Sequence, residues 1–406
     1  MKTCYAFLIA FFILYTAQTA EYYADPTVED GGQGTRESPW PSLQKSIAEG
    51  NLSKLKPSDT LYLKDGYHGS ATISGINEDF ITITSAPDQQ ATLSRLTLTK
   101  AARWNITNLR ISPTFGGQPY KGDIVTLTNK HPESGKNILE NCEIFAEDSH
   151  LDFEFEDWIN VNKGVLIGQY GTGTIVRNCY IRNTRFALTM TAFDCLAEGN
   201  VIEHYSGDGI RMTRDGQTAQ YNIIKKAFAP TWKGDKNHDD AIQCFLHEKG
   251  SGTMRNLTIS HNIIIGHDPK AEPFAAINQG IGLFDGPLVN FTIEGNVVMV
   301  NHWHGISVYD GQDCTIASNV VWSKFKGKMQ PSIRLGQKLN KARDNIVTGN
   351  FSPSYGIAQP GTKSRKNKYS TRKVYRMSLQ NLLAEHNALF GFYHPIANRE
   401  RILEDL

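Results

Sequence analysis

Short apolar strands recur along the chain at a regular spacing. The segments TIVRNCYI at 174–181, CLAEGNVI at 195–202 and FTIEGNVVMV at 291–300 each place an asparagine between alternating apolar residues and further β-forming residues. The closest of these asparagines lie 22 or 23 residues apart. Such a period is typical of a β-solenoid, because one coil cannot bury its apolar side without a neighbouring coil. The pattern therefore predicts an all-β, single-domain right-handed parallel β-helix.

The repeated asparagines predict a ladder of side-chain amides along one turn of the coil. Asparagine tolerates the turn conformation, and its amide can bond the equivalent amide of the next coil. The residues that follow, such as Val201, Ile223 and Val320, are then expected to stack in line. Cys142 and Cys179 share a column immediately after an asparagine, and we interpret both as small buried apolar residues. The asparagines of this repeat are Asn108, Asn141, Asn178, Asn200, Asn222, Asn262, Asn296, Asn319 and Asn350.

A second strand in each coil gathers distant residues onto one surface. It is visible in GDGIRM at 207–212, DDAIQC at 239–244, NQGIGLF at 278–284 and WHGISVY at 303–309. Alternation points one apolar residue of each copy inward and its neighbour outward. The expected inward column is Val165, Leu188, Ile210, Ile242, Ile281, Ile306 and Ile333. The expected outward columns are Arg211, Gln243, Ser307 and Arg334 and, one position before a small residue, Lys163, Phe186, Asp208, Asp240, Gln279 and His304.

The beginning of the chain has the pattern of an export signal. Lys2 precedes a short apolar run, and small residues follow it up to Ala20. The run is too short to span a bilayer, so residues 1–20 are predicted to be a signal peptide rather than a membrane anchor. We therefore expect a secreted or periplasmic protein with no membrane insertion.

The segments on either side of the repeats are expected to cover the ends of the solenoid. An uncapped solenoid would expose its core and a strand edge. A helix is expected near residues 40–50, and MSLQNLLAEHNALF at 377–390 is predicted to form an amphipathic helix that Ser378 caps. The expected segments are an N-terminal lead-in and cap at 21–55, the β-helix at 56–352, and a basic C-terminal extension with the short amphipathic helix at 353–406.

The charge balance excludes long-range attraction of a polyanion by the whole molecule. The chain has 42 Lys and Arg against 41 Asp and Glu, so any attraction must come from a local groove. The run 363–376 carries seven basic residues in fourteen, and we interpret it as a solvated tail in preference to a polyanion site. The five cysteines beyond Cys4 have no tight spacing, which argues against a disulfide framework. We expect a monomer with no nucleic-acid partner.

Two stretches of the chain resemble known β-helix proteins. The opening YYADP…GGQGT…PW, followed by LKPSDTLYLKDGYHG, resembles the start of many secreted bacterial right-handed β-helix proteins. The stretch from NHDDAIQ at 237 through NQGIGLFDGP at 278 to NHWHGISVYDGQDCTIASNVV at 301 resembles a β-helix group associated with alginate lyases. More distantly, the chain resembles mannuronan C5-epimerases, although it lacks their Tyr and Asp-Pro-His cluster. The resemblance implies an acidic polysaccharide as the substrate.

The segment WKGDKNHDDAIQCF at 232–245 is the richest in groups that could carry chemistry. A lyase must neutralise the uronate carboxylate, remove the C5 proton and protonate the leaving oxygen. Arg211 could pair with the carboxylate. Lys236 or His238 could be the base, with a tyrosine or a second histidine as the acid, and Asp239 and Asp240 could orient His238. The predicted catalytic residues are His238, Lys236, Arg211, Asp240 and His304.

The same surface is predicted to bind the polymer. Phe245, Phe284 and Tyr309 share an outward column and could stack on sugar rings. The predicted substrate-binding residues are Asp239, Gln243, Phe245, Gln279, Phe284, Asp285, His302, Tyr309 and Arg334. No metal site or cofactor is assigned, but Asp208, Asp239 and Asp240 could hold calcium against a uronate. The structural alternative is a cluster of polar side chains that caps turns around a long loop.

These observations favour a secreted polysaccharide lyase that cleaves a uronic-acid polymer by β-elimination, with alginate as the leading substrate. A mannuronan C5-epimerase shares the proton-abstraction step. A polygalacturonase-like hydrolase would use Asp-Gly-Ile at 208–210, Asp239 and Asp240, His304 and Arg334, but a whole coil at 278–284 separates the Asp pair from His304. A non-catalytic carbohydrate-binding β-helix protein is the remaining alternative.

Overall fold

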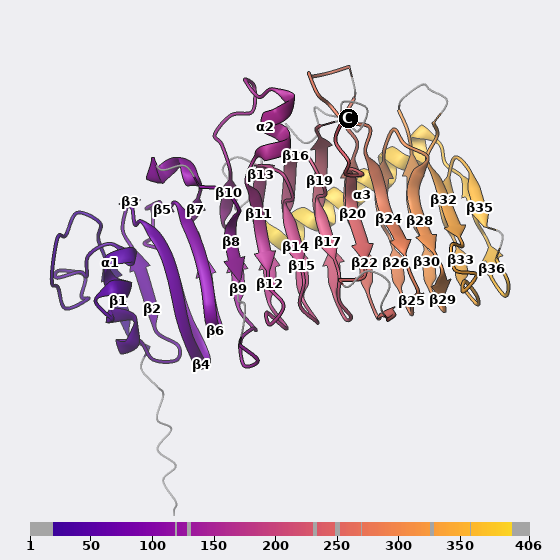
Figure 1. The fold of residues 1–406 in the computed structure, drawn as a ribbon. Helices are drawn as coiled ribbons and strands as arrows, with labels where there is room; N and C mark the ends of the chain where they lie inside the picture. Colours follow the sequence, from indigo (N-terminus) through magenta and orange to yellow (C-terminus); the bar gives the residue numbers. More distant parts are fainter. Residues whose placement is uncertain are drawn as a thin grey trace, which may run out of the picture.

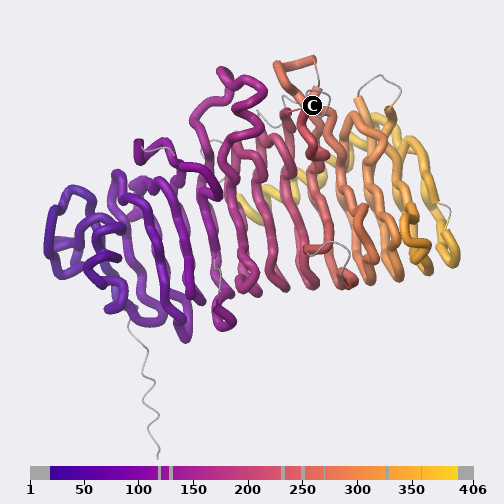
Figure 2. The backbone as a smooth tube through the Cα atoms, in the orientation of Figure 1, coloured from indigo at the N-terminus to yellow at the C-terminus, as the bar shows by residue number. Residues whose placement is uncertain are grey.

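The computed structural model describes residues 19–117, 120–127, 131–229, 234–247, 252–268, 270–324, 329–357 and 359–391. In this part of the chain the backbone winds into a long stack of coils around an apolar core (Figures 1 and 2). Neighbouring coils pair in parallel, which confirms the predicted all-β, right-handed parallel β-helix. The predicted signal peptide lies, up to residue 18, outside the described residues.

Each coil contributes strands to three faces. The long strands β4 and β6 bend from the first face to the second and so join these two faces into one 22-stranded sheet. The first face contains β4 (Ser70–Ser85), β6 (Arg95–Thr107), β8 (Asp123–Leu127), β11 (Lys163–Ile167), β14 (Leu188–Met190), β17 (Ile210–Met212), β20 (Asp240–Phe245), β24 (Gln279–Asp285), β28 (His304–Tyr309), β32 (Ser332–Gly336) and β35 (Tyr355–Ile357).

The second face continues from the ends of β4 and β6. It further contains β1 (Glu21–Ala24), β2 (Thr60–Leu63), β9 (Ile138–Glu140), β12 (Ile175–Arg177), β15 (Leu196–Glu198), β18 (Thr218–Gln220), β22 (Thr258–Ser260), β26 (Thr292–Glu294), β30 (Thr315–Ala317), β33 (Ile346–Thr348) and β36 (Lys363–Arg365). Short strands β21 (Met254–Arg255), β25 (Leu288–Val289) and β29 (Gly311–Gln312) form a separate three-stranded sheet.

The third face is a 12-stranded sheet. It contains β3 (Gly66–Tyr67), β5 (Ala91–Leu93), β7 (Arg110–Ile111), β10 (Glu143–Phe145), β13 (Tyr180–Thr184), β16 (Val201–Tyr205), β19 (Ile223–Ala227), β23 (Ile263–Ile265), β27 (Val297–Met299), β31 (Val320–Trp322), β34 (Phe351–Ser352) and β37 (Lys368–Tyr369). Strands β35, β36 and β37 add one further coil within residues 353–406, where a basic extension was expected.

The predicted inward column of the first face is confirmed by the strand register. The Cα partners run from Val165 through Ile242 to Ile333 without a break, and each of the seven side chains is at most 1% exposed. The small residues that precede this column sit where the first face meets the third. A Cβ on Gly209 would lie 2.6 Å from the Ala241 carbonyl oxygen and 2.8 Å from a methyl of Ile224. Small residues here therefore let the two faces close around the core.

The amide ladder forms, but it begins later than the sequence indicates. From Asn200 onward each asparagine is fully buried and its Nδ2 donates to the Oδ1 of the next rung at 2.9–3.0 Å, as between Asn262 and Asn296. Asn108, Asn141 and Asn178 instead occupy the left-handed turn position one residue earlier, with φ between 49° and 59°. Cys142 and Cys179 occupy the ladder position of their coils and are fully buried, as predicted for small apolar residues. The ladder ends on Asn367, which the sequence pattern did not include.

The helices cover surfaces that the coils leave open. Helix α1 (Leu43–Ala48) lies within the expected 40–50 region, next to the 3-10 helix η1 (Asn51–Lys54). A second 3-10 helix, η2 (Pro113–Gly116), and helix α2 (Phe155–Asn160) lie in insertions between coils. No helix in the described part of the chain is long and apolar enough to cross a membrane.

The C-terminal helix α3 (Arg372–Phe390) lies along the outside of the third face and runs back from the last coil toward the middle of the stack (Figure 1). It packs Tyr375, Leu379 and Leu382 against residues of β13 to β31. The predicted start near residue 377 is wrong, because Thr371 caps the helix by accepting a hydrogen bond from the Val374 N–H at 3.3 Å.

Candidate active site

The first face carries three columns of outward side chains between β17 and β32. At the start of the strands lie Asp208, Asp240, Gln279 and His304, and in the middle Arg211, Gln243, Gly282, Ser307 and Arg334. At the end lie Phe245, Phe284 and Tyr309, but a register shift pairs Phe245 with Asp285, so Phe245 is not in line with Phe284 as the sequence predicted. The register brings together residues more than 100 positions apart in sequence. It also places β24 between Asp240 and His304, as the sequence indicated.

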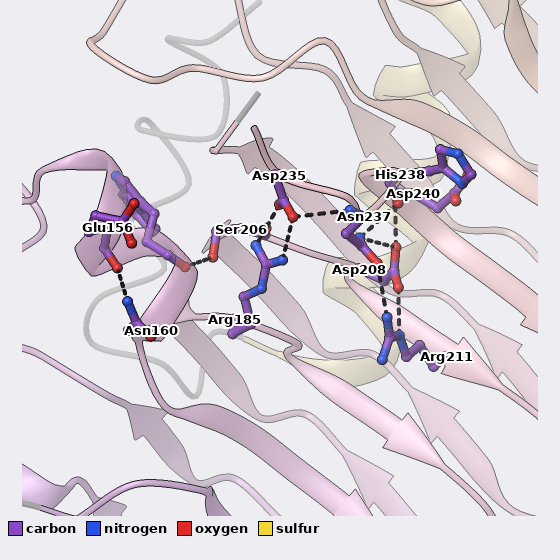
Figure 3. Close-up of polar contacts among 11 residues, drawn as sticks. Glu156, Asn160, Arg185, Ser206, Asp208, Arg211, Asp235, Asn237, His238 and Asp240 are labelled. Carbon is purple, nitrogen blue, oxygen red and sulfur yellow. Dashed lines mark hydrogen bonds and ion pairs between the residues drawn. The ribbon is translucent and has the colours of Figure 1, made fainter. Parts of the chain in front are cut away.

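Asp208 is the centre of a compact ion-pair network at the start of β17 and β20. Its Oδ2 accepts a hydrogen bond from Arg211 Nε at 2.5 Å, and its Oδ1 accepts from the Asp240 N–H at 3.1 Å. Asn237 joins the two, because its Nδ2 lies 3.3 Å from Asp208 and its Oδ1 accepts from Arg211 Nη2 at 3.2 Å (Figure 3). Arg211 also lies flat over the Phe186 ring, 3.4 Å from its centroid. These contacts fix the guanidinium in one orientation.

The carboxyl group of Asp240 lies in the space that an outward side chain at Gly282 would occupy. A Cβ on Gly282 would lie 2.3 Å from Asp240 Oδ1, so only glycine leaves room for the carboxyl there. Gln243 donates to Asp240 Oδ2 at 3.2 Å. Burial raises the pKa of Asp240 well above its usual range, and the nearby Asp208 carboxylate adds to the effect. Both effects favour the neutral form of the Asp240 carboxyl, and Gln243 is the one described side chain that bonds this carboxyl.

The segment that carries Lys236, Asn237 and His238 is anchored by a buried ion pair. Arg185, at the end of β13, donates to both oxygens of Asp235 at 2.7 and 2.8 Å. Arg185 also donates to the Ser206 carbonyl, and the Ser206 hydroxyl donates to the Trp158 carbonyl in α2. Figure 3 follows this chain of contacts from α2 to Arg211. The anchor orders a loop that would otherwise be free to move.

The structure separates the predicted residues of this loop. Lys236 and His238 are exposed on the side of the first face. Asp239 is only 2% exposed, and neither of its oxygens has a hydrogen-bond partner among the described residues. Burial raises the pKa of Asp239 well above its usual range, and Asp235 and Asp208 raise it further. Asp239 therefore belongs to the buried cluster and does not reach the surface predicted to bind substrate.

Two histidines from β28 and the turn before it form the opposite side of the site. The rings of His302 and His304 stack with centroids 5.1 Å apart. His302 Nδ1 accepts a hydrogen bond from the His304 N–H at 3.2 Å, which leaves the ring proton on Nε2. His304 Nδ1 bonds the buried Ser307 hydroxyl at 2.8 Å, so Nε2 of His304 points away from its anchor.

Both histidines are neutral at physiological pH. Burial lowers the pKa of His302 to about 4, and the His304 and His238 rings lower it further. Burial also lowers the pKa of His304 to about 4, with contributions from Arg334 and His238. His238, His302, His304 and Arg334 therefore lie close enough to influence one another. A neutral ring is required of a histidine that accepts a proton.

Aromatic side chains cover the far end of the strands. Phe284 contacts the His304 ring at 5.0 Å between centroids and the Tyr309 ring at 5.5 Å, edge to face in both cases. Phe245 lies 5.7 Å from the Arg211 guanidinium. Asp285 is exposed next to Phe284, whereas Gln279 is 9% exposed and its Oε1 has no hydrogen-bond partner in the described part of the chain.

The acidic residues do not fit the calcium site considered from the sequence. Among the described residues, no group of three or more His, Cys, Asp or Glu side chains is arranged to hold a metal ion. Asp208 is paired with Arg211, and burial favours the protonated forms of Asp239 and Asp240. Protonated carboxyls are poor ligands for a hard cation. No step proposed below depends on calcium.

Several residues of the site were not found from the sequence. Arg185 and Asp235 are 50 positions apart and meet only because β13 lies beside the insertion that follows β19. The sequence does not distinguish Gly282 from any other glycine in a strand. Its role follows only from the Asp240 carboxyl, which lies beside it in the fold. Asn237 had a weak signal, since it lies beside His238 and Asp239 in the polar segment at 232–245.

Comparisons with known proteins identify the fold. No family model matches the chain, and no curated protein sequence matches it. Among solved structures, the Dettilon tailspike protein is similar with a TM-score of 0.55 and 15% identity, over 87% of this chain and 69% of that one. The A-module of a mannuronan C-5 epimerase from Azotobacter vinelandii is similar with a TM-score of 0.51 and 11% identity, over 81% of this chain and 93% of that one.

An alginate lyase from Paenibacillus matches with a TM-score of 0.44 and 15% identity, over 81% of this chain and 95% of that one. This chain is a parallel β-helix protein. Identities this low establish the shared fold alone, so the reaction has to be argued from the residues of the first face.

Proposed function

We propose that this protein is a polysaccharide lyase that cleaves a uronic-acid polymer by β-elimination, with alginate as the first substrate to test. The observation that carries the proposal is the neutral His302–His304 pair, which shares one face with the cationic side chains Arg211 and Arg334. Proton abstraction next to a carboxylate needs this combination of a proton acceptor and positive charge. The site residues span five strands, about 19 Å at about 4.8 Å per strand, which suits a polymer better than a single sugar.

In the proposed reaction His304 is the base. Its Nδ1 is anchored to Ser307, and its Nε2 takes the C5 proton as the electron pair of the broken C–H bond forms the C4–C5 double bond. The C4–O4 bond breaks, and O4 takes a proton from the exposed His238. The bound uronate carboxylate raises the pKa of His304 from about 4 toward neutrality, because a negative charge stabilises the imidazolium. The role of His304 therefore differs from the acid role considered from the sequence.

Cationic side chains of the first face can pair with carboxylates of the polymer. Arg334 lies one strand from His304 and can neutralise the carboxylate of the reacting sugar, whereas Arg211 lies three strands away, about 14 Å at about 4.8 Å per strand, and can pair with the carboxylate of another unit. Arg211 is held by Asp208, Asn237 and Phe186, and its Nη1 has no bond to any described residue. Arg334 lies at the other end of the same column, and Lys236 is exposed at the edge of the face. An epimerase would use the same abstraction and return a proton to the opposite side of C5.

The test is absorbance near 235 nm after mixing the protein with alginate, polygalacturonate and glycosaminoglycans. A rise reports the unsaturated uronate of a lyase product. We expect His304→Ala to lower the rate by about 100-fold or more, the usual contribution of a positioned base. His261→Ala is the matched control, since His261 stacks on Tyr221 at the turn between the second and third faces. No rise with any of these polymers would reject the lyase proposal.

A glycoside hydrolase is the second candidate. It is favoured by the contact between Asp208 and Asp240, because burial raises the pKa of Asp240, as the role of a general acid requires. Two observations oppose it: Asp240 has no exposed surface, and Asp208 is already paired with Arg211. A hydrolase would release reducing ends without a rise in absorbance, and Asp240→Asn would abolish that release.

A further inference from the structure

A small pocket adjoins the proposed catalytic residues at the far end of β20, β24 and β28. Its volume is about 250 Å³, and its wall includes Phe245, Phe284, Asp285, Asp310, Lys338 and Leu339. Pockets for drug-sized ligands are typically about 300–1,000 Å³, so this one suits a single sugar unit. Phe284 forms its wall on one side and contacts the His304 ring on the other. An occupant would therefore lie next to the proposed base.

One side of the pocket is built by the loop after β32, which the sequence did not assign to any site. The buried Asp310 carboxylate accepts hydrogen bonds from the backbone N–H groups of Lys338 and Leu339 at 3.0 Å and of Lys341 at 3.3 Å. Three donors on one carboxylate fix this loop against the coil. The anchored loop presents Lys338 to the aromatic side chains.

Lys338 and Asp285 form a pair of opposite charges at the rim of the pocket. Lys338 Nζ lies 3.3 Å from Asp285 Oδ1, and both side chains are more than half exposed. The same ammonium lies 5.9 Å from the centroid of Phe284 and 5.8 Å from that of Tyr309. Gly336 leaves the space for the Tyr309 ring, because a Cβ there would lie 2.4 Å from a ring carbon. The pocket thus combines an aromatic wall with one donor and one acceptor.

We propose that this pocket is a subsite that binds the polymer residue next to the reacting one by its ring face and a pair of neighbouring hydroxyls. A hydroxyl both donates and accepts, whereas an ionised Asp only accepts and a Lys only donates. One hydroxyl can donate to Asp285 while its neighbour accepts from Lys338. A carboxylate at the same place would compete with Asp285 for Lys338 and would lie beside a like charge, which is unfavourable.

This inference rests on the proposed function for the identity of the polymer, and it adds how the neighbouring residue is recognised. The carboxylate of the reacting uronate binds Arg334, that of another unit binds Arg211, and the hydroxyls of the adjacent unit bind Asp285 and Lys338. The subsite would therefore bind a sugar unit with or without a carboxylate, provided that the unit carries the two hydroxyls.

The test compares two variants of the rim pair. The full-length protein is titrated with saturated tetrasaccharides of mannuronate and galacturonate and with a neutral glucan tetrasaccharide, and Kd is measured by ligand-observed NMR. We expect Lys338→Met and Asp285→Asn each to weaken binding of the preferred probe by about tenfold, which is about 1.4 kcal/mol. Lys45→Met, which breaks an exposed ion pair with Asp30 at the N-terminal cap, is the matched control and should leave Kd unchanged.

The outcomes separate this inference from the proposed reaction. Tighter binding by Asp285→Asn with weaker binding by Lys338→Met would mean that Lys338 binds a carboxylate. This result would overturn the proposal that the pair binds two neighbouring hydroxyls. Turnover of a polymer with Kd unchanged in both variants would reject the subsite and leave the lyase intact. Binding that depends on both residues, without turnover of any polymer, would support the subsite and reject the lyase. No binding of any probe would reject both.

Discussion

At the scale of single residues, burial shifts ionisable groups of the first face toward their neutral forms. The carboxyl of Asp240 lies in the space left by Gly282, and burial raises the pKa of this carboxyl. His304 loses its proton for the same physical reason, since burial disfavours the charged form of either group. The proposed reaction uses the neutral form of His304 as its base, whereas Asp240 takes no part in it.

The pH dependence of turnover tests this assignment of His304. Because its pKa is about 4, His304 is neutral above this pH and protonated below it. Activity should therefore persist at mildly acidic pH and be lost as the pH falls through about 4. This limb should appear in kcat/KM, which reports the free enzyme. The limb of kcat should lie at higher pH, because the bound carboxylate raises the pKa. The profiles are measured as initial rates of the absorbance assay.

A variant separates His304 from other groups that titrate in acid. Arg334 is one of the charges that lower the pKa of His304. Arg334→Gln should therefore move the acid limb of kcat/KM to higher pH, in addition to any loss of rate. A limb near pH 6.5 in the unmodified protein, or a limb that does not move in Arg334→Gln, would show that another group is the base.

The sequence indicated which residues share a face, but it could not indicate their burial. Alternation predicted the outward columns of β17 to β32 because strand periodicity is a local property. Asp239 and Asp240 are adjacent and chemically identical, yet only the fold determines that one lies in the buried cluster with Arg185 and the other beside Gly282. Such differences depend on neighbours tens of residues away, which a single sequence does not reveal.

At the scale of elements, the amide ladder stabilises the turn between the second and third faces. Asn262 accepts from the backbone and side chain of Asn222 and donates to Asn296 and to the Ala219 carbonyl. All these groups are buried, so water cannot replace a lost partner. The ladder was predictable from the asparagine repeat. Its start was not, because Asn178 and Asn200 follow the same local motif but differ by one residue in turn geometry.

Removing one rung should destabilise the fold strongly. Asn262→Ala leaves two donors of Asn222 without their acceptor, and each buried unsatisfied group costs about 1–3 kcal/mol. We expect the free energy of unfolding to fall by about 3 kcal/mol, measured by urea denaturation. Asn160→Ala, at the exposed end of α2, should change it by less than about 0.5 kcal/mol. Equal effects of the two substitutions would show that the ladder adds no stability.

Helix α3 packs against the outer surface of the third face and is not part of any coil. Leu379 is 1% exposed against the third face, whereas Met377 two residues earlier is 53% exposed. Leu379→Ala should weaken this contact by about 2–5 kcal/mol and accelerate hydrogen exchange in α3, with no change in exchange of β16 or β19. Met377→Ala should have no such effect. Loss of protection throughout the third face would show that the coils themselves depend on α3.

At the scale of the whole molecule, the solenoid converts a repeat in sequence into a row of functional groups in space. Stacked strands carry cations, neutral histidines and aromatic rings to one face, in an order set by the register. The near-neutral net charge of +1 means that the attraction for a polyanion is local to this face. The fold alone is compatible with several carbohydrate reactions, so the chemistry of the first face has to distinguish them.

The most direct test of the central claim is whether the protein removes the C5 proton of a uronate. Alginate and polygalacturonate are incubated with the protein in D₂O and followed by proton NMR, beside His304→Ala. We expect loss of the C5 proton signal with the appearance of a vinylic C4 proton, and we expect His304→Ala to abolish both changes. A C5 signal that persists while reducing ends accumulate would contradict it and would assign the first face to a hydrolase.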